Sequence, residues 1–183
     1  MKTAITIMFF ANFFCNAQSS GLIRNGSFEA GLENWKGDAA VITSYDFKQG
    51  KKAMMINQFV GKEWKAIDQI ITIPKNAHAI QFSGWIKTTS VEGGKELWNK
   101  ALVALEFRTG NKGVSNANVI EVGGTTEWKE FKKAVLVPPG VNEVRLMLAL
   151  AQTSGTLLCD DLKAVALSEE EYLKLVAPLA KHQ

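Results

Sequence analysis

Apolar and polar residues alternate with a period of two along most of the chain, and Gly, Pro and Asn mark the breaks between the alternating segments. This pattern is typical of half-buried β-strands separated by turns. It predicts long strands at 66–74, 79–89, 101–109, 130–138, 142–151 and 156–167, and shorter ones at 23–29, 39–44 and 52–57. Such a series of strands, without alternating helices, favours an all-β fold: a two-sheet antiparallel β-sandwich of the jelly-roll type.

The N-terminal end departs from this pattern. Residues 1–17 resemble an export signal, because the basic Lys2 precedes an apolar run over 4–14 and small residues follow at 15–17. We expect cleavage near Ala17 and a secreted, periplasmic or cell-surface protein, with a lipid-modified Cys15 as an alternative. The apolar run is shorter than the ~20 residues of a membrane-spanning helix, so no membrane span is predicted.

The C-terminal residues 168–183 are expected to form a short helix and a frayed tail. Ser168 and Glu171 have the spacing of a capping box, in which each residue accepts a hydrogen bond from the backbone of the other. Pro178 predicts the end of the helix. Between the two ends, residues 18–167 form one predicted domain.

Composition narrows the classes of function. The chain has 183 residues, and its 21 basic and 18 acidic residues give a net charge of +3. The basic residues are scattered, so no nucleic-acid partner is predicted. The chain has two cysteines. With Cys15 in the predicted signal, Cys159 is left without a disulfide partner, and we expect it to be a small buried residue.

Five segments resemble, in their order along the chain, the carbohydrate-binding modules of the galactose-binding-like jelly-roll group (families 4, 9 and 22). They are "NGSFEAGLENW" (25–35), "QGKKAMMI" (49–56), "DQIITIPKNAHAIQFSGWIKT" (68–88), "TTEWKEF" (125–131) and "GTLLCDDLKAVAL" (155–167). The resemblance implies an exported, non-catalytic module that binds a polysaccharide or oligosaccharide. It also implies a glycoside hydrolase or a cell-surface protein as a partner, and a structural calcium ion.

Three residues are candidates for that calcium site. By similarity with the family, Glu29 and Asp160 would supply side-chain oxygens, and Lys52 or Lys51 a backbone carbonyl. Calcium takes 6–8 oxygen ligands, which carboxylates and carbonyls can provide together. Asp160 shares strand parity with Leu158 and is expected to point inward, where an unpaired carboxylate would be costly. The alternative is that these carboxylates pair with Lys or Arg and that an ammonium group replaces the metal.

The sugar-binding residues are predicted from strand alternation. In 81–87, Phe82 and Ile86 should face the core, which places Ser83, Trp85 and Lys87 outside. The same argument places Glu106, Arg108 and Arg145 outside. If the predicted strands 79–89, 101–109 and 142–151 share a sheet, these six residues form one surface. An indole ring covers the C–H-rich face of a sugar, and charged planar groups bind its hydroxyls. The alternative is that a loop covers Trp85, which then only packs.

Two further tryptophans lie in polar loops, where packing alone explains a large aromatic poorly. Trp98 belongs to the loop 90–101, which is long enough to form a wall above the sheet, and it is the second candidate for sugar stacking. Trp64 is the third candidate.

The sequence contains no motif that favours an enzyme. His78 is in a predicted turn and His182 is in the tail, and Asp68 with Glu106 is the candidate carboxylate pair for glycoside hydrolysis. We therefore predict a protein without enzymatic activity. A second hypothesis is an adhesive β-sandwich that binds a protein at the cell surface. In a glycan-binding module, Trp85 and Trp98 should line a polar groove, whereas in an adhesive β-sandwich they should belong to a flat apolar patch.

Overall fold

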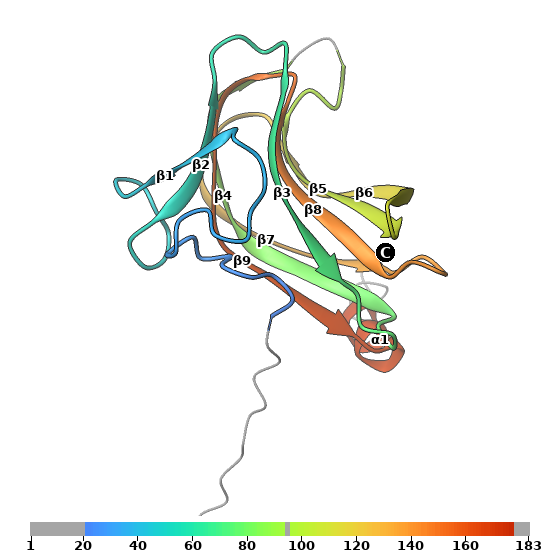
Figure 1. The fold of residues 1–183 in the computed structure, drawn as a ribbon. Helices are drawn as coiled ribbons and strands as arrows, with labels where there is room; N and C mark the ends of the chain where they lie inside the picture. Colours follow the sequence, from blue (N-terminus) through green and yellow to red (C-terminus); the bar gives the residue numbers. More distant parts are fainter. Residues whose placement is uncertain (1–20, 94–95, 178–183) are drawn as a thin grey trace, which may run out of the picture.

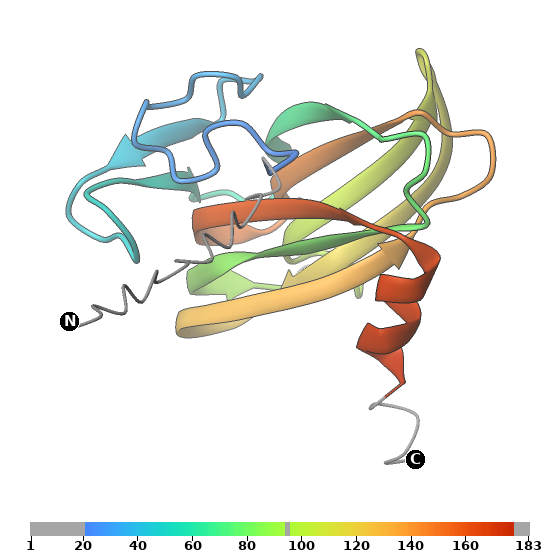
Figure 2. The ribbon, with the colours of Figure 1, turned by 90° about the horizontal axis from the view of Figure 1, so that it is seen from below.

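The computed structural model describes residues 21–93 and 96–177, which form two antiparallel β-sheets packed face to face (Figures 1 and 2). The first sheet has the strand order β1-β2-β9-β4-β7, and the second has the order β3-β8-β5-β6. The strands are β1 (Ala40–Thr43), β2 (Ala53–Gln58), β3 (Trp64–Thr72), β4 (Ala79–Glu92), β5 (Ala101–Thr109), β6 (Lys112–Val122), β7 (Gly124–Leu136), β8 (Glu143–Ala151) and β9 (Ser154–Leu167). The predicted all-β sandwich is confirmed.

The core lies between the two sheets and is built from the inward residues of each strand. In β5 these are Val103, Leu105 and Phe107, and β4 contributes Phe82 and Ile86. Cys159 of β9 is buried among them, as expected. Burial raises the pKa of the Cys159 thiol well above its ordinary value, so the group is a packing residue.

The strand predictions are confirmed for the six long segments and for the two short ones that correspond to β1 and β2. One strand was missed, β6, and β7 begins at Gly124, six residues before the predicted start. Both differences fall in a stretch rich in Gly, Ser, Thr and Asn. These residues weaken the apolar alternation on which the prediction rests.

The predicted strand at 23–29 is wrong, because this segment forms turns. Asn25 and Phe28 have left-handed backbone angles, with φ of 50° and 56°, which no strand accommodates. The Asn25 side chain stabilises the turns by donating to the carbonyls of Gly31 and Glu33 and accepting from the Ala30 amide. Phe28 is fully buried and packs on the buried Trp35, with ring centroids 5.3 Å apart.

The C-terminal helix α1 (Glu169–Val176) continues from β9 at one end of the sandwich (Figure 2). The predicted capping box is confirmed, because Ser168 Oγ accepts from the Glu171 amide and the Glu171 carboxylate accepts from the Ser168 amide. In the described part of the chain, no helix is long and apolar enough to cross a membrane. The predicted signal at 1–17 and residues 178–183 lie outside the described residues.

Candidate functional site

The outward residues of β3, β8, β5 and β6 form one continuous surface, the curved face. Residues directly opposite one another on neighbouring strands point to the same side, so the strand register orders them into rows. The sheet bends so that this surface lies on its concave side (Figure 1). Three successive rows, each given in the strand order β3, β8, β5, β6, are Ala66-Ala149-Leu102-Glu121, Asp68-Met147-Ala104-Asn118 and Ile70-Arg145-Glu106-Asn116.

The middle of the curved face is apolar. Leu102, Ala104, Ala149 and Ala151 form a buried cluster that is separate from the main core, and Ala66 and Met147 pack against it. Four of these six side chains are alanines, whereas the floor is bordered by longer side chains such as Trp64, Arg145 and Glu121. The sequence therefore builds an apolar floor between taller polar and aromatic groups.

A network of charged side chains borders this floor. Arg145 Nη2 donates to Asp68 Oδ2 at 2.8 Å, and Arg145 Nη1 lies 3.9 Å from Glu106 Oε2. The hydrogen bond to Asp68 raises the pKa of Arg145. Arg108 Nε lies 3.8 Å from the same Glu106 oxygen. Gly113 on β6 leaves room for this carboxylate, because a Cβ there would lie 2.7 Å from Glu106 Oε1.

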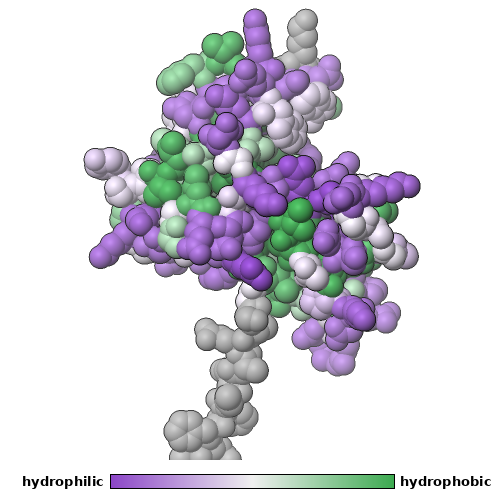
Figure 3. All heavy atoms as spheres, viewed as in Figure 1, coloured by the Kyte–Doolittle hydropathy of each residue, from purple (hydrophilic) through white to green (hydrophobic). Residues whose placement is uncertain are grey.

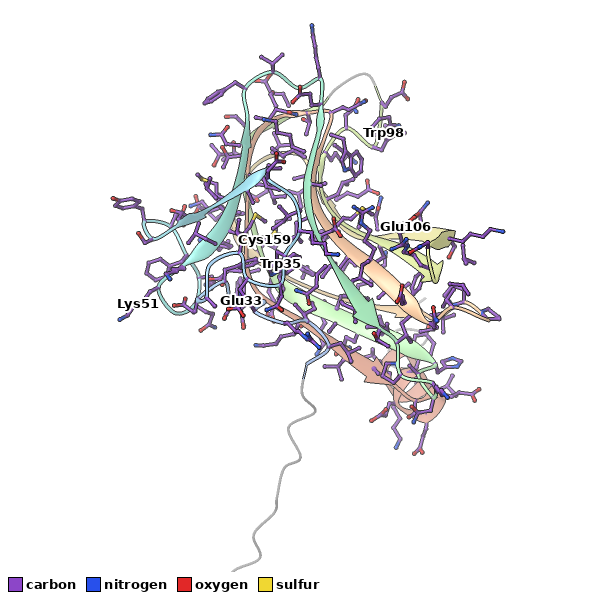
Figure 4. All side chains as sticks on the ribbon, in the orientation of Figure 1. Glu33, Trp35, Lys51, Trp98, Glu106 and Cys159 are labelled. Carbon is purple, nitrogen blue, oxygen red and sulfur yellow. The ribbon has the colours of Figure 1, made fainter. Side chains whose placement is uncertain are left out.

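Trp64 and Trp98 lie at the opposite end of the floor. Trp64 is the register partner of Ala151, and the Lys100 carbonyl accepts from the Ala151 amide on the other side. The buried Asn99 fixes the loop, since its Nδ2 donates to the Ala151 carbonyl and its Oδ1 accepts from the Glu96 amide. Trp64 and Trp98 are 46% and 42% exposed. Figure 4 shows Trp98 and Glu106 on the same side of the molecule.

Strand β6 completes the rim with residues that the sequence reasoning did not find. Asn118 Nδ2 donates to Glu121 Oε1 at 2.8 Å, and Lys100 Nζ lies 3.4 Å from Glu121 Oε2. The Asn118 hydrogen bond, with Lys100, holds the pKa of Glu121 below its ordinary value. The Gly110-Asn111 turn followed by Val and Ile is the signal that could have identified this strand. Figure 3 shows hydrophilic side chains gathered over the region of β5, β6 and β8.

Two hollows adjoin the curved face along β3. One, of about 600 Å³, is lined by Ile70 and Thr72 of the strand together with Arg24 and Lys36. The other, of about 320 Å³, is lined by Trp64, Ala66 and Asp38, among others. The surface around β3 is therefore recessed at both ends of the strand.

The six residues predicted to share one surface are divided between the two sheets. Glu106, Arg108 and Arg145 are on the curved face, whereas Ser83, Trp85 and Lys87 belong to β4, which is in the other sheet. The assumption that the three strands share a sheet is wrong. Sequence alternation gives the side of a strand on which a residue lies, but it does not tell which strands pair.

The outer surface around Trp85 is covered by the segment 44–52. Lys48 Nζ lies 4.1 Å from the Trp85 ring centroid. Lys87 Nζ lies 3.1 Å from Asp46 Oδ2 and 3.2 Å from Glu127 Oε2. The half-buried Trp128 also binds Asp46, since its Nε1 donates to Oδ1 at 2.8 Å. Trp85 is half-buried beneath this segment.

Glu29 and Asp160, the predicted calcium ligands, both bind the same segment through its amide groups. Glu29 Oε1 accepts from the Lys51 and Lys52 amides at 2.8 and 3.0 Å. Asp160 Oδ2 accepts from the Lys48 and Gln49 amides, both at 2.8 Å. The Lys51 hydrogen bond lowers the pKa of Glu29, whereas burial raises the pKa of Asp160.

Asp160 is fully buried, but it does not point into the core between the sheets as predicted. It is the register partner of Trp85, while its neighbour Cys159 pairs with the core residue Ile86. A register shift and the positive φ of Asp161, 49°, mark a β-bulge at this point. Asp160 therefore lies on the outer side of its sheet, and the segment 44–52 buries it.

These residues do not fit a calcium ion as they are arranged. Three of the four carboxylate oxygens accept N–H groups, and the Lys52 ammonium donates to the Glu29 carbonyl at 2.8 Å. In residues 21–93 and 96–177, no three His, Cys, Asp or Glu side chains are grouped to hold a metal. Backbone amides are the donors to both carboxylates, and the Lys52 ammonium binds the Glu29 carbonyl rather than a carboxylate oxygen.

Comparison with known proteins shows what the fold is similar to. No protein-family model matches the sequence, and no curated protein matches it. A family 16 carbohydrate-binding module has a TM-score of 0.62 at 16% identity, over 79% of this chain and 99% of that one. A family 61 module, solved with β-1,4-galactotriose, has a TM-score of 0.57 at 17% identity, over 81% of this chain and 100% of that one.

Two other structures widen the comparison. The CBM22-1 xylan-binding domain of Xyn10C from Paenibacillus barcinonensis has a TM-score of 0.56 at 16% identity, over 78% of this chain and 92% of that one. The enzymatically active domain of bacteriophage CBA120 tailspike protein 4 has a TM-score of 0.61 at 14% identity, over 80% of this chain but only 21% of that one. The chain therefore has the β-sandwich fold of carbohydrate-binding modules, and the resemblance found in the sequence is confirmed at the level of the fold.

Proposed function

We propose that this protein is a secreted, non-catalytic glycan-binding module that holds a polysaccharide or oligosaccharide on the curved face. The observation that carries the proposal is the position of two exposed tryptophans near Ala151. Trp64 pairs with Ala151 on one side, and Trp98 precedes Asn99 and Lys100, which bind Ala151 on the other. Across two strand spacings, their chain segments are about 10 Å apart.

This arrangement suits the chemistry of a sugar. A pyranose ring has C–H-rich faces that bury well against indole rings, and its edge carries hydroxyl groups. The apolar floor of Ala66, Ala149 and Leu102 offers no competing hydrogen bonds. Beyond it, the Arg145 guanidinium and the carboxylates of Asp68 and Glu106 provide planar donors and acceptors for hydroxyls. The fold of solved carbohydrate-binding modules supports the same conclusion.

Isothermal titration calorimetry against soluble xylan, galactan, β-glucan and mannan tests the proposal. We expect saturable binding to at least one polymer, and a loss of roughly tenfold or more in affinity for Trp64→Ala and for Trp98→Ala. Trp85→Ala is the matched control, because it removes the same side chain from the opposite sheet. A loss of binding in Trp85→Ala alone would move the site to the surface beneath Lys48.

Absence of binding to every polymer would favour the adhesive alternative, a β-sandwich that binds a protein. The large exposed apolar residues Phe59, Val60 and Leu97 support that alternative, because they are not explained by packing. An enzymatic role has less support. Asp68 and Glu106, the candidate carboxylate pair for glycoside hydrolysis, both lie within 4 Å of Arg145, which makes them partners of a guanidinium rather than a free acid and base.

A further inference from the structure

Three cations on or beside the curved face, Arg145, Arg108 and Lys100, each lie near a carboxylate. Arg145 is paired with Asp68 at 2.8 Å, Arg108 lies 3.8 Å from Glu106, and Lys100 lies 3.4 Å from Glu121. Glu106 also approaches Arg145, at 3.9 Å, so a single carboxylate balances part of the charge of both arginines.

Arg108 depends strongly on Glu106. Its side chain is 15% exposed, and its Nε is buried without a hydrogen-bond partner. A buried charge is costly unless an opposite charge lies nearby, and here the Glu106 carboxylate lies within 4 Å. Without Glu106, this guanidinium would be an unpaired cation at the edge of the sugar-binding surface. An anion from solution could then stabilise it.

We propose that the curved face selects neutral glycans, and that Asp68 and Glu106 are the residues that exclude acidic ones. This inference rests on the proposed function. The carboxylate of a uronic acid needs an unpaired cation to replace the water it loses on binding. On this surface it meets guanidinium groups that already have carboxylate partners, and it is repelled by those partners. A neutral sugar is not repelled by these carboxylates, because its hydroxyls can donate to carboxylates and accept from guanidinium groups.

The test compares neutral and acidic polymers on the same protein variants. Affinities for xylan and galactan, and for polygalacturonate and alginate, are measured by calorimetry at low salt for wild type, Glu106→Gln and Asp68→Asn. We expect the wild type to bind a neutral polymer and to bind both acidic ones at least roughly tenfold more weakly. Each substitution should raise the ratio of acidic to neutral affinity by roughly tenfold, because it frees an arginine for a charge-assisted contact.

Glu127→Gln is the matched control. It removes the same charge from an exposed position on β7, where Glu127 pairs with Lys87 of β4. Both strands belong to the sheet that does not carry the curved face. This variant should leave the affinity ratio at the wild-type value. The acidic binding gained in Glu106→Gln or Asp68→Asn should weaken as salt is added, as expected for an exposed ionic contact.

Two variants are needed because Glu106→Gln leaves Arg108 buried without a partner and could fail to fold. Asp68→Asn affects Arg145, which is 40% exposed and tolerates the loss of its partner better. The inference is overturned if the wild type binds acidic polymers as tightly as neutral ones, or if neither folded variant raises the ratio above that of Glu127→Gln. In both cases the proposed function stands. A wild-type protein that binds no polymer would overturn both.

Discussion

Glu29 shows how one exposed carboxylate fixes a segment of the chain. Its Oε1 accepts the Lys51 and Lys52 amides, and the Lys51 hydrogen bond lowers its pKa in the folded state. A lowered pKa stabilises the fold at a pH above the ordinary value of 4.5, and this stabilisation is lost as the pH falls through the lowered pKa. At neutral pH, we therefore expect the free energy of unfolding to be larger for wild type than for Glu29→Gln. This difference should shrink towards pH 3. Urea denaturation at several pH values measures it, and a difference independent of pH would contradict the assignment.

Gly50 lies in the same segment, and both its backbone angle and its surroundings require a residue without a side chain. Its φ is +64°, and a Cβ there would collide with the Glu29 carboxylate. Gly50→Ala should therefore cost roughly 2–3 kcal/mol in free energy of unfolding. The matched control is Gly110→Ala in the β5–β6 turn, where φ is +56° and nothing lies within 4 Å of the added atom. It should cost only about 1 kcal/mol. Equal losses in the two variants would mean that the Glu29 contact does not matter.

At the level of elements, the segment 44–52 joins the N-terminal turns to β9 through hydrogen bonds within the protein. The Lys52 ammonium and four backbone amides bind Glu29 and Asp160. A ligand stabilises a protein only when it binds the folded state more tightly than the unfolded one. We expect the melting temperature to stay within about 1 °C when EDTA or excess calcium is added. Lowering of the melting temperature by EDTA, restored by calcium, would show that these carboxylates hold an ion.

Asn99 positions the neighbouring Trp98. The Asn99 side chain is buried, and its hydrogen bonds to the Ala151 carbonyl and the Glu96 amide are the fixed point of the loop. Asn99→Ala should leave the sandwich folded but reduce glycan affinity by roughly tenfold, because Trp98 must then be ordered on binding. Asn76→Ala, in the exposed turn between β3 and β4, is the control and should bind as wild type does. If the glycan affinity of Asn99→Ala were unchanged, Trp98 would not belong to the binding site.

Individual strands could be predicted from the sequence far better than the sheets they form. Residues 101–109 were predicted to the residue, because large apolar side chains alternate there without interruption. Strand β6 was missed, because Asn116 and Asn118 are polar residues of an edge strand that faces the site. The partners of β4 depend on contacts between segments far apart in sequence, and alternation carries no information about them. For this reason the prediction that Trp85 shares a surface with Glu106 and Arg145 is wrong. The prediction that it lies on the outer side of its own strand is correct.

At the scale of the whole molecule, the two sheets enclose Cys159, which therefore reports on whether the sandwich stays closed. The residue is fully buried in the core, and burial raises the pKa of its thiol, so both access and the reactive thiolate are suppressed. In a Cys15→Ser protein, Cys159 should not react with a thiol reagent such as DTNB under native conditions. We expect its labelling rate to rise with urea in parallel with the loss of tertiary structure, because only separation of the sheets exposes it.

Substitutions beside Trp98 and substitutions in the core should affect the labelling of Cys159 differently. Asn99→Ala should change ligand binding without changing Cys159 labelling, because residues 96–100 are not part of the core. A core substitution such as Phe82→Ala should accelerate labelling, since it removes a large side chain between the sheets at a typical cost of about 3–5 kcal/mol. If Asn99→Ala accelerated labelling as much as Phe82→Ala, the loop and the core would unfold as one unit. The glycan site could then not be altered independently of the fold.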